Sequence, residues 1–435
     1  MKLKLKNLGK ISYADIDING ITVIAGKNNT GKSTIGKCLF AYYNSFYKID
    51  EAVNKLRQNE ICRLFDESLN SYVEEKNDRY YSNTRMLSSE LVKRLGHFIE
   101  PTFDNKDPAI FDKPEVKGIV DRLCREYGCK DRDKIIEFYT EARKKASVID
   151  EKIIRKTIVN DKFNSVFNGQ ICNTNSKEAT SVEITIKDKV SKLLFDDNDL
   201  KDFEQPIKIE HDATLIDDPM IIDKLVEYRH LYINNDLHHQ VLIDKIYLAK
   251  RRHETSLNSI LVKEKMQELL KTINDVVQGE LVVQNGTIML LEKSNKGPIS
   301  LMNLSLGLKS FVLIKQLIEN ELIKDNDFLI LDEPEVHLHP EWQIKFAEIV
   351  VLLQKAYNLN VVLTTHSRDF FEAIELFSKK YGITEKCNYY ITHEKRGKIE
   401  FCDQKTDPTE IYRQLIEPND LLDKLRFELE EEENE

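Results

Sequence analysis

The chain has 435 residues, of which 41% are hydrophobic and 32% charged, with a formal net charge of −10. This composition is typical of a globular protein and excludes a disordered or fibrous chain. The negative charge also excludes a globally basic nucleic-acid-binding protein, but it leaves room for a local basic patch.

Signals for secretion, membrane insertion or disulfide formation are weak in this sequence. The first residues, MKLKLKNLGK, alternate Lys and Leu and lack the apolar core of a signal peptide. No apolar run approaches the roughly 18 residues that a membrane span needs. The seven Cys include no CxxC pair, so we expect reduced thiols and no zinc site. These features predict a cytoplasmic protein that does not enter a membrane.

The first predicted elements are strands at Leu3–Leu5, Ile11–Ile18 and Ile21–Ala25, where apolar residues alternate or follow one another directly. The pair Asn19-Gly20 predicts a turn between the second and third strands. A Gly-rich loop and a helix over about residues 32–43 follow.

The Gly-rich loop reads GKNNTGKS and fits the pattern GxxxxGK[ST] between a strand and a helix. In such a loop, backbone N–H groups and the positive end of the helix converge on phosphate oxygens. Lys32 is expected to bridge the β- and γ-phosphates of a nucleotide, and the Ser33 hydroxyl to hold Mg²⁺. The predicted nucleotide-binding residues are Gly26, Asn28, Asn29, Thr30, Gly31, Lys32, Ser33 and Thr34.

The middle of the chain, from about residue 44 to 163, has a helical and highly charged pattern. Basic clusters at residues 143–145 and 152–156 are interpreted as solvated helix faces in preference to a nucleic-acid-binding surface. Short strands are predicted at Val182–Ile186 and Ile207–Ile209.

The segment before the last third predicts a helix followed by a hairpin. Apolar residues from Leu257 to Val277 recur at helical spacing, and Gly279 marks the end of that helix. Asn285-Gly286 then joins two apolar runs, which is a strong hairpin signal.

The last third has the alternating pattern of an α/β fold. Phe328–Leu331 and Val361–Thr364 are apolar strands of the buried parallel type. Helices over about residues 340–356 and 369–378 follow them, with Pro340 at a first helical turn.

Two carboxylates follow the first of these strands. Asp332 is expected to reach Mg²⁺, directly or through water, and Glu333 to activate or position the attacking water. Upstream, Ser305 and Gly307 lie at the start of an apolar-faced helix, where they predict a second cradle for the γ-phosphate.

His366 directly follows the second strand, where a neutral imidazole can sense or orient the γ-phosphate. Glu335, His337 and His339 form a nearby cluster that could suggest a metal. Because the two histidines are two residues apart in a loop without Cys, we favour dimer-contact or structural roles.

Together these motifs resemble those of ATP-binding-cassette (ABC) ATPases. Gly26–Ser33 resembles Walker A, Asn303–Lys309 the signature motif, Phe328–Pro334 Walker B, and His366 the switch histidine. The motifs are most similar to those of the branch that contains the structural-maintenance-of-chromosomes (SMC), RecF and overcoming-lysogenization-defect (OLD) proteins. The sequence EPEVHLHP, followed by TTHS, resembles the OLD-like proteins in particular.

The chain also departs from that pattern. A Q-loop glutamine is not obvious, and Gln170 is the candidate. The middle region lacks the long heptad arms of chromosome proteins. The segment after His366 offers Asp403 and Asp407 but no Asp-x-Asp pair, so we expect no Toprim nuclease domain.

We therefore expect an α/β P-loop NTPase fold of ABC type, with a two-lobed head and a mostly helical insertion. Residues 1–45 and 251–425 would form the head, residues 46–250 the insertion, and residues 426–435 an acidic tail.

The resemblance implies an ATPase with ATP and Mg²⁺ as cofactors. It implies a homodimer or higher oligomer in which Ser305 and Gly307 of one copy complete the ATP site of the other. Stand-alone ATPases of this type are similar to components of bacterial anti-phage systems, where a separate nuclease or toxin is the effector.

Three other functions stay open. A DNA-repair or chromosome ATPase would clamp nucleic acid, with strongly salt-dependent affinity. A transporter subunit is disfavoured by the large middle insertion, and a non-hydrolysing scaffold by Glu333.

Overall fold

The structure is a computed structural model, and it divides the chain into two compact units. It describes residues 1–75, 89–94, 111, 113–126, 131–225, 236–249, 267–284, 287–292 and 297–434. The first unit comprises Met1–Tyr47 and Val159–Glu435, and the second comprises Lys48–Ile158. The expected insertion, 46–250, is thus too long, because the strands after residue 179 pair with the N-terminal strands of the first unit.

The first unit is built on an 11-stranded sheet with the order β6-β5-β4-β1-β2-β14-β13-β3-β12-β11-β7. The segment β13-β3-β12-β11-β7 is entirely parallel, whereas β6-β5-β4-β1-β2 is antiparallel. The strands are β1 (Lys2–Leu8), β2 (Ile11–Asp17), β3 (Ile21–Ala25), β4 (Thr180–Ile186), β5 (Lys189–Asp196), β6 (Asp199–Glu204), β7 (Ala213–Ile216), β11 (Phe328–Asp332), β12 (Asn360–Thr365), β13 (Cys387–Lys395) and β14 (Lys398–Asp403).

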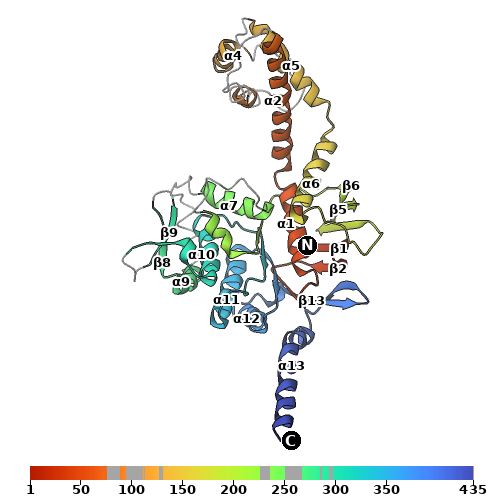
Figure 1. The fold of residues 1–435 in the computed structure, drawn as a ribbon, viewed down its shortest axis with the longest axis vertical. Coiled ribbons are helices and arrows are strands. Elements are labelled where there is room, and N and C mark those ends of the chain that lie inside the picture. Colours follow the sequence, from red (N-terminus) through yellow and green to blue (C-terminus); the bar gives the residue numbers. More distant parts are fainter. Residues whose placement is uncertain are drawn as a thin grey trace. The chain divides into compact units, whose positions relative to one another are not determined.

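Helices and a small second sheet complete this unit (Figure 1). The second sheet has the order β10-β9-β8, with β8 (Gly279–Gln284), β9 (Thr287–Glu292) and β10 (Ile299–Ser300). The helices are α1 (Lys32–Phe46), α7 (Leu237–Ala249), α9 (Gln267–Val276), α10 (Leu306–Glu319), α11 (Pro340–Tyr357), α12 (Arg368–Lys380) and α13 (Thr409–Asn434), with short 3₁₀ turns at η2 (Pro219–Leu225), η5 (Leu301–Asn303) and η6 (Thr384–Lys386).

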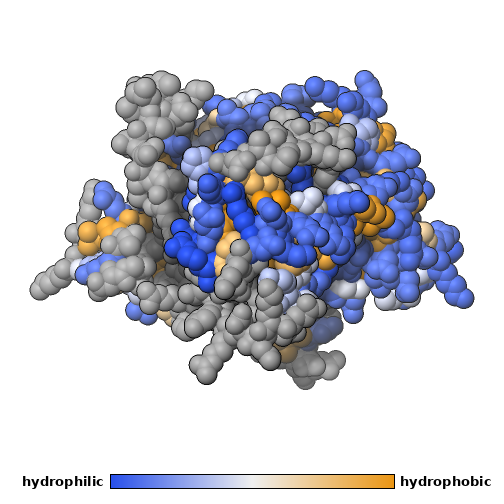
Figure 2. Space-filling view, turned by 90° about the horizontal axis from the view of Figure 1, so that it is seen from above, coloured by the Kyte–Doolittle hydropathy of each residue, from blue (hydrophilic) through white to orange (hydrophobic). Residues whose placement is uncertain are grey.

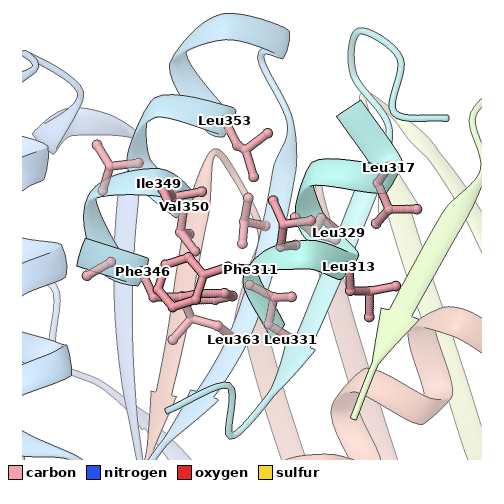
Figure 3. Close-up of a cluster of buried hydrophobic side chains, with 14 of the residues drawn as sticks. Phe311, Leu313, Leu317, Leu329, Leu331, Phe346, Ile349, Val350, Leu353 and Leu363 are labelled. Carbon is pink, nitrogen blue, oxygen red and sulfur yellow. The ribbon is translucent and has the colours of Figure 1, made fainter. Parts of the chain in front are cut away.

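The main core lies between the parallel strands and helices α10 and α11. Figure 3 shows Leu329 and Leu331 of β11 among the apolar side chains of these two helices. Side chains alternate along a strand, and Ile330 points to the opposite face, where it meets Gly36 of α1. Helices thus cover both faces of the parallel strands, as such sheets require. The labelled core residues are Phe311, Leu313, Leu317, Leu329, Leu331, Phe346, Ile349, Val350, Leu353 and Leu363.

Most expected elements of this unit are present, with one error. The strand expected at Ile207–Ile209 is irregular backbone, and the strand beside β11 is instead β7. The two strands of the expected hairpin, β8 and β9, pair directly from Gln284 to Thr287. Their turn residues, 285–286, lie outside the described part of the chain. Of the helix expected from Leu257 to Val277, residues 257–266 also lie outside it, and α9 forms the rest.

The second unit is helical, as expected for this region. Its apolar core includes Phe65, Leu123 and Tyr139, contributed by α2 (Ile49–Glu75), α4 (Pro114–Glu126) and α5 (Arg132–Ser147). The boundary with the first unit falls within α6 (Glu151–Phe167). In the basic clusters, Lys145 and Arg155 form ion pairs within their own helices, which supports the interpretation of solvated helix faces.

The surface in Figure 2 is predominantly hydrophilic, with scattered hydrophobic residues. Among the residues that the structure describes, no helix is both long and apolar enough to cross a membrane.

Candidate nucleotide-binding site

The parallel strands bring three of the sequence motifs to one edge of the sheet. Ala25 pairs with Thr365, and Thr364 pairs with Asp332, so β3, β12 and β11 end at the same level. The Gly-rich loop follows β3, His366 follows β12, and the carboxylate pair closes β11. Loops at the carboxyl ends of parallel strands are where α/β folds bind ligands.

The Gly-rich loop requires glycine at its first position. Gly26 has φ +152°, and a Cβ there would lie 1.8 Å from Oγ1 of Thr392 on β13. The Thr392 hydroxyl donates a 2.8 Å hydrogen bond to the hydroxyl of Thr30, and Thr30 donates to the carbonyl of Lys27 at 2.8 Å. Strand β13 therefore fixes the shape of the loop.

The loop continues into α1 through left-handed backbone. Asn29 has φ +65°, and Gly31, the N-cap of α1, has φ +78°. Gly31 has no side chain that could cap this helix end, and uncapped N–H groups at the start of a helix can bind an anion. The arrangement fits the phosphate cradle that the sequence predicts.

Lys32 is only 4% exposed. Its ammonium donates a 2.8 Å hydrogen bond to the Lys27 carbonyl and lies 3.9 Å from Oε1 of Glu333. Burial lowers the pKa of Lys32, while Glu333 and Asp332 oppose that shift. A phosphate beside this ammonium would stabilise its charged form.

Asp332 and Ser33 offer the hard oxygen ligands that Mg²⁺ prefers. The Asp332 carboxylate accepts a 2.6 Å hydrogen bond from the Thr364 hydroxyl. Burial raises the pKa of Asp332, and hydrogen bonds from Thr364 and Ser33 oppose that shift. Because the Ser33 hydroxyl is close enough to the carboxylate to affect its pKa, the two groups fit one magnesium ion.

Glu333 and His366 face each other. Nε2 of His366 lies 2.6 Å from Oε1 of Glu333. Glu333 has φ +47°, a region that non-glycine residues occupy at a cost and that recurs at functional sites. Burial, assisted by the charge of Lys32, lowers the pKa of His366 although Glu333 opposes it, and this shift favours the neutral imidazole.

A residue whose role the sequence did not predict holds the histidine in place. Glu335 is 3% exposed, and its Oε1 accepts hydrogen bonds from the Thr365 hydroxyl at 2.6 Å and from the His366 N–H at 2.8 Å. Expected only as a dimer-contact or structural residue, it anchors the turn after β12. The sequence signal was a second glutamate two residues after Glu333.

A cavity of about 400 Å³ adjoins the Gly-rich loop and α1. Its lining includes Lys32, Ser33, Thr34, Glu333 and Gln170. The cavity is large enough for a nucleotide, since ligand pockets usually begin near 300 Å³. The Q-loop role of Gln170 stays a prediction.

The signature residues lie elsewhere in the same chain. Ser305 caps α10 and accepts a 3.3 Å hydrogen bond from the Leu308 N–H. Gly307 is buried, and a Cβ there would lie 3.0 Å from the His337 carbonyl. Neither residue lines the cavity beside Lys32, so their binding of a nucleotide stays a prediction. His339 caps α11, which is a structural role.

The mixed sheet and the Gly-rich loop together assign this chain to the class of P-loop ATPases. Within this class, the chain belongs to the AAA_15 family of AAA ATPase domains, which matches residues 1–371. It is 25% identical over 403 residues to the "Retron Vc95 probable ATPase" of Vibrio cholerae serotype O1 biovar El Tor, covering 83% of this chain and 68% of that protein.

Among solved structures, two SMC heads are similar to the chain. An SMC head domain from Thermotoga maritima is 12% identical, with a TM-score of 0.37, covering 92% of this chain and 97% of that one. An SMC head bound to the C-winged helix domain of ScpA is 10% identical, with a TM-score of 0.39 and coverages of 94% and 98%.

Proposed function

We propose that this protein binds ATP with Mg²⁺ and hydrolyses it to ADP and phosphate. The observation that carries this proposal is the close contact of Glu333 with His366, 2.6 Å apart, within 3.9 Å of the Lys32 ammonium. In this proposal Lys32 is the phosphate-binding lysine of the Gly-rich loop. The Glu333 carboxylate would therefore lie next to the γ-phosphate of a bound nucleotide.

In this proposal each group has a separate task. Lys32 and the N–H groups at the start of α1 hold the β- and γ-phosphates. Ser33 and Asp332 would hold Mg²⁺, which supplies charge neutralisation for the phosphates. Glu333 accepts the proton of the attacking water, and His366 orients the glutamate and the γ-phosphate. The site-residue assignments for Gly26, Asn28, Asn29, Thr30, Gly31 and Thr34 belong to the same proposal.

We further propose that a second copy completes the site. Ser305 is exposed at the start of α10, where a hydroxyl and a helix N-terminus can meet an anion. Ser305 does not line the cavity of its own chain. The γ-phosphate that it contacts would therefore belong to a nucleotide bound to a partner copy. Hydrolysis would then open the dimer.

The relative named as a retron ATPase supports a role in bacterial defence. We propose that the ATP-bound dimer controls a separate effector, a nuclease or a toxin, in an anti-phage system. The DNA-clamp alternative has no comparable support among the described residues, where the basic clusters form ion pairs within helices.

The variant Glu333→Gln tests the proposal. The amide is nearly isosteric but cannot accept a proton, so we expect ATP turnover to fall by about 100-fold or more while ATP affinity is kept. The closed, ATP-bound dimer should accumulate. Phosphate release, nucleotide binding and sizing with ATP measure these three effects.

Glu341→Gln is the matched control, because Glu341 is an exposed glutamate at the start of α11. It should behave like the unchanged protein. Wild-type turnover in Glu333→Gln would refute the catalytic assignment. In cells that carry the neighbouring genes, Glu333→Gln should change phage resistance and Glu341→Gln should not, and equal resistance in both would refute the defence role.

A further inference from the structure

A second cluster of chemically active side chains lies outside the proposed ATP machinery. Asp217 follows β7, and His238 and His239 begin α7. Nε2 of His238 lies 2.7 Å from Oδ2 of Asp217, and Nε2 of His239 lies 2.9 Å from Oδ1. Both imidazoles therefore direct the same ring nitrogen at one carboxylate.

His238 is the buried member of the cluster, whereas Asp217 and His239 are partly exposed. His238 is 2% exposed, and its ring packs edge-to-face against Phe40 of α1, with the ring centroids 6.0 Å apart. The two imidazole centroids are 4.2 Å apart. Such a buried, apolar surrounding strengthens electrostatic interactions within the cluster.

The sheet places this cluster beside the carboxylates of the ATP site. Ile216 pairs with Leu331 on the neighbouring strand, so Asp217 and Asp332 leave the sheet at the same level. They line a common cavity of about 180 Å³. Two carboxylates that line one small cavity repel each other. A cation at Asp217 would relieve this repulsion.

We propose that Asp217, His238 and His239 form a binding site for a first-row divalent transition-metal ion such as Zn²⁺. One ligand atom from each residue lies within 4.8 Å of the others, and two imidazole nitrogens with one carboxylate oxygen are a ligand set typical of these metals. The remaining coordination position would face water or a bound group.

Only a small shift is needed to admit the ion. In a tetrahedral zinc site with bonds near 2.1 Å, ligand atoms lie about 3.4 Å apart, whereas the nitrogen–oxygen distances here are 2.7 and 2.9 Å. The ion would take the place of the contacts between the two Nε2 atoms and the carboxylate, and each neutral imidazole would then carry its proton on Nδ1. Because protons compete with zinc for imidazole nitrogens, zinc binding weakens as the pH falls.

This site is separate from the proposed magnesium site. Its imidazole ligands suit zinc, whereas Ser33 and Asp332 supply only hard oxygen atoms. Zinc binding should thus need neither ATP nor Lys32. The variant Lys32→Ala, which removes the phosphate-binding charge, should bind zinc as tightly as the unchanged protein.

Equilibrium dialysis of the full chain against Zn²⁺, without nucleotide, tests the proposal. We expect one tightly bound zinc ion per chain. Asp217→Asn and His239→Gln should each weaken binding by about 100-fold or more. His211→Gln is the matched control, because His211 is half-exposed and its nearest carboxylate, on Asp327, is 3.6 Å away.

Co²⁺ in place of Zn²⁺ identifies the ligands spectroscopically. The wild-type protein should show visible bands of a low-coordinate nitrogen and oxygen site, without the charge-transfer band of a thiolate. This distinction matters because the described cysteines, Cys38, Cys62, Cys124, Cys172, Cys387 and Cys402, form no disulfides.

Absence of zinc binding to the wild-type chain would overturn the proposal, as would a thiolate spectrum. Wild-type affinity in His239→Gln would also overturn it. If the two ligand variants do not fold, the wild-type stoichiometry and Co²⁺ spectrum still decide. Loss of binding in Lys32→Ala or Asp332→Asn, but not in His239→Gln, would assign the metal to the ATP site.

Discussion

Single side chains decide the geometry of the turn that carries His366. Oε1 of the buried Glu335 accepts hydrogen bonds from Thr365, His366 and Ser367. Burial raises the pKa of Glu335, and these hydrogen bonds oppose that shift. The carboxylate thus supports the backbone that positions the histidine without approaching the cavity itself.

Glu335→Ala is therefore expected to remove the acceptor of the His366 N–H and the shorter hydrogen bond of the Thr365 hydroxyl, whereas the Ser367 N–H keeps the Thr365 hydroxyl as acceptor at 3.0 Å. The cost should be about 2–4 kcal/mol of folding free energy, and misplacement of His366 should lower the turnover number with little change in ATP affinity. Chemical denaturation and steady-state ATPase assays measure the two effects.

Glu335→Gln is the conservative comparison, because its amide oxygen can accept the same hydrogen bonds. It should recover most of the stability and turnover that Glu335→Ala loses. Equal losses in the two variants would show that the charge of Glu335, not its hydrogen bonding, is what matters.

At the scale of elements, the approach of α1 to the sheet positions the Gly-rich loop. A Cβ at Gly36 of α1 would lie 2.7 Å from Cγ2 of Ile330 on β11. Only glycine allows this approach, so β11, with its carboxylates, and the start of α1 lie close together. The exposed Gly118, in α4, has no heavy atom within 4 Å of the same position.

The two helical glycines should consequently respond in opposite ways to alanine. Gly36→Ala should destabilise the first unit by about 1–3 kcal/mol through overpacking. Gly118→Ala should stabilise the second unit by about 0.5–1 kcal/mol, because glycine is a poor helix former. Urea denaturation measures both, and stabilisation by Gly36→Ala would contradict the close packing.

At the scale of the whole molecule, the proposed site is shared between two copies. Lys32→Ala disables the Gly-rich loop, and Ser305→Arg blocks the second cradle with a bulky side chain. Each homodimer then has two defective sites. In a mixed dimer, one site has both defects, and the other combines an intact Lys32 with an intact Ser305.

Mixing the two inactive variants should restore part of the ATPase activity, because one intact site forms in each heterodimer. The matched control mixes Lys32→Ala with the double variant Lys32→Ala/Ser305→Arg, in which no intact site can form. Phosphate release at several mixing ratios measures the rescue. No rescue, with heterodimers shown by sizing of tagged copies, would contradict a shared site in which one half works alone.

Local sequence patterns were sufficient for the elements that carry the ATP chemistry. The Gly-rich loop between β3 and α1, the acidic end of β11 and the histidine after β12 are all where the sequence predicts them. Hydrophobic runs and turn residues are local signals, and a phosphate loop needs a fixed strand–loop–helix order. The sequence by itself therefore determined the class of protein and the motif residues.

Long-range pairing decided the rest. The predicted turn at Asn19-Gly20 is present, but it gives no sign that β14 and β13 lie between β2 and β3 in the sheet. The sequence analysis did not predict β7. It therefore did not predict that Asp217, which follows β7, leaves the sheet beside Asp332 at the end of β11. Strand order depends on contacts between residues far apart in the chain, which no local period encodes. Only the tertiary structure could bring Asp217 to His238 and His239, or Glu335 to the turn that holds His366.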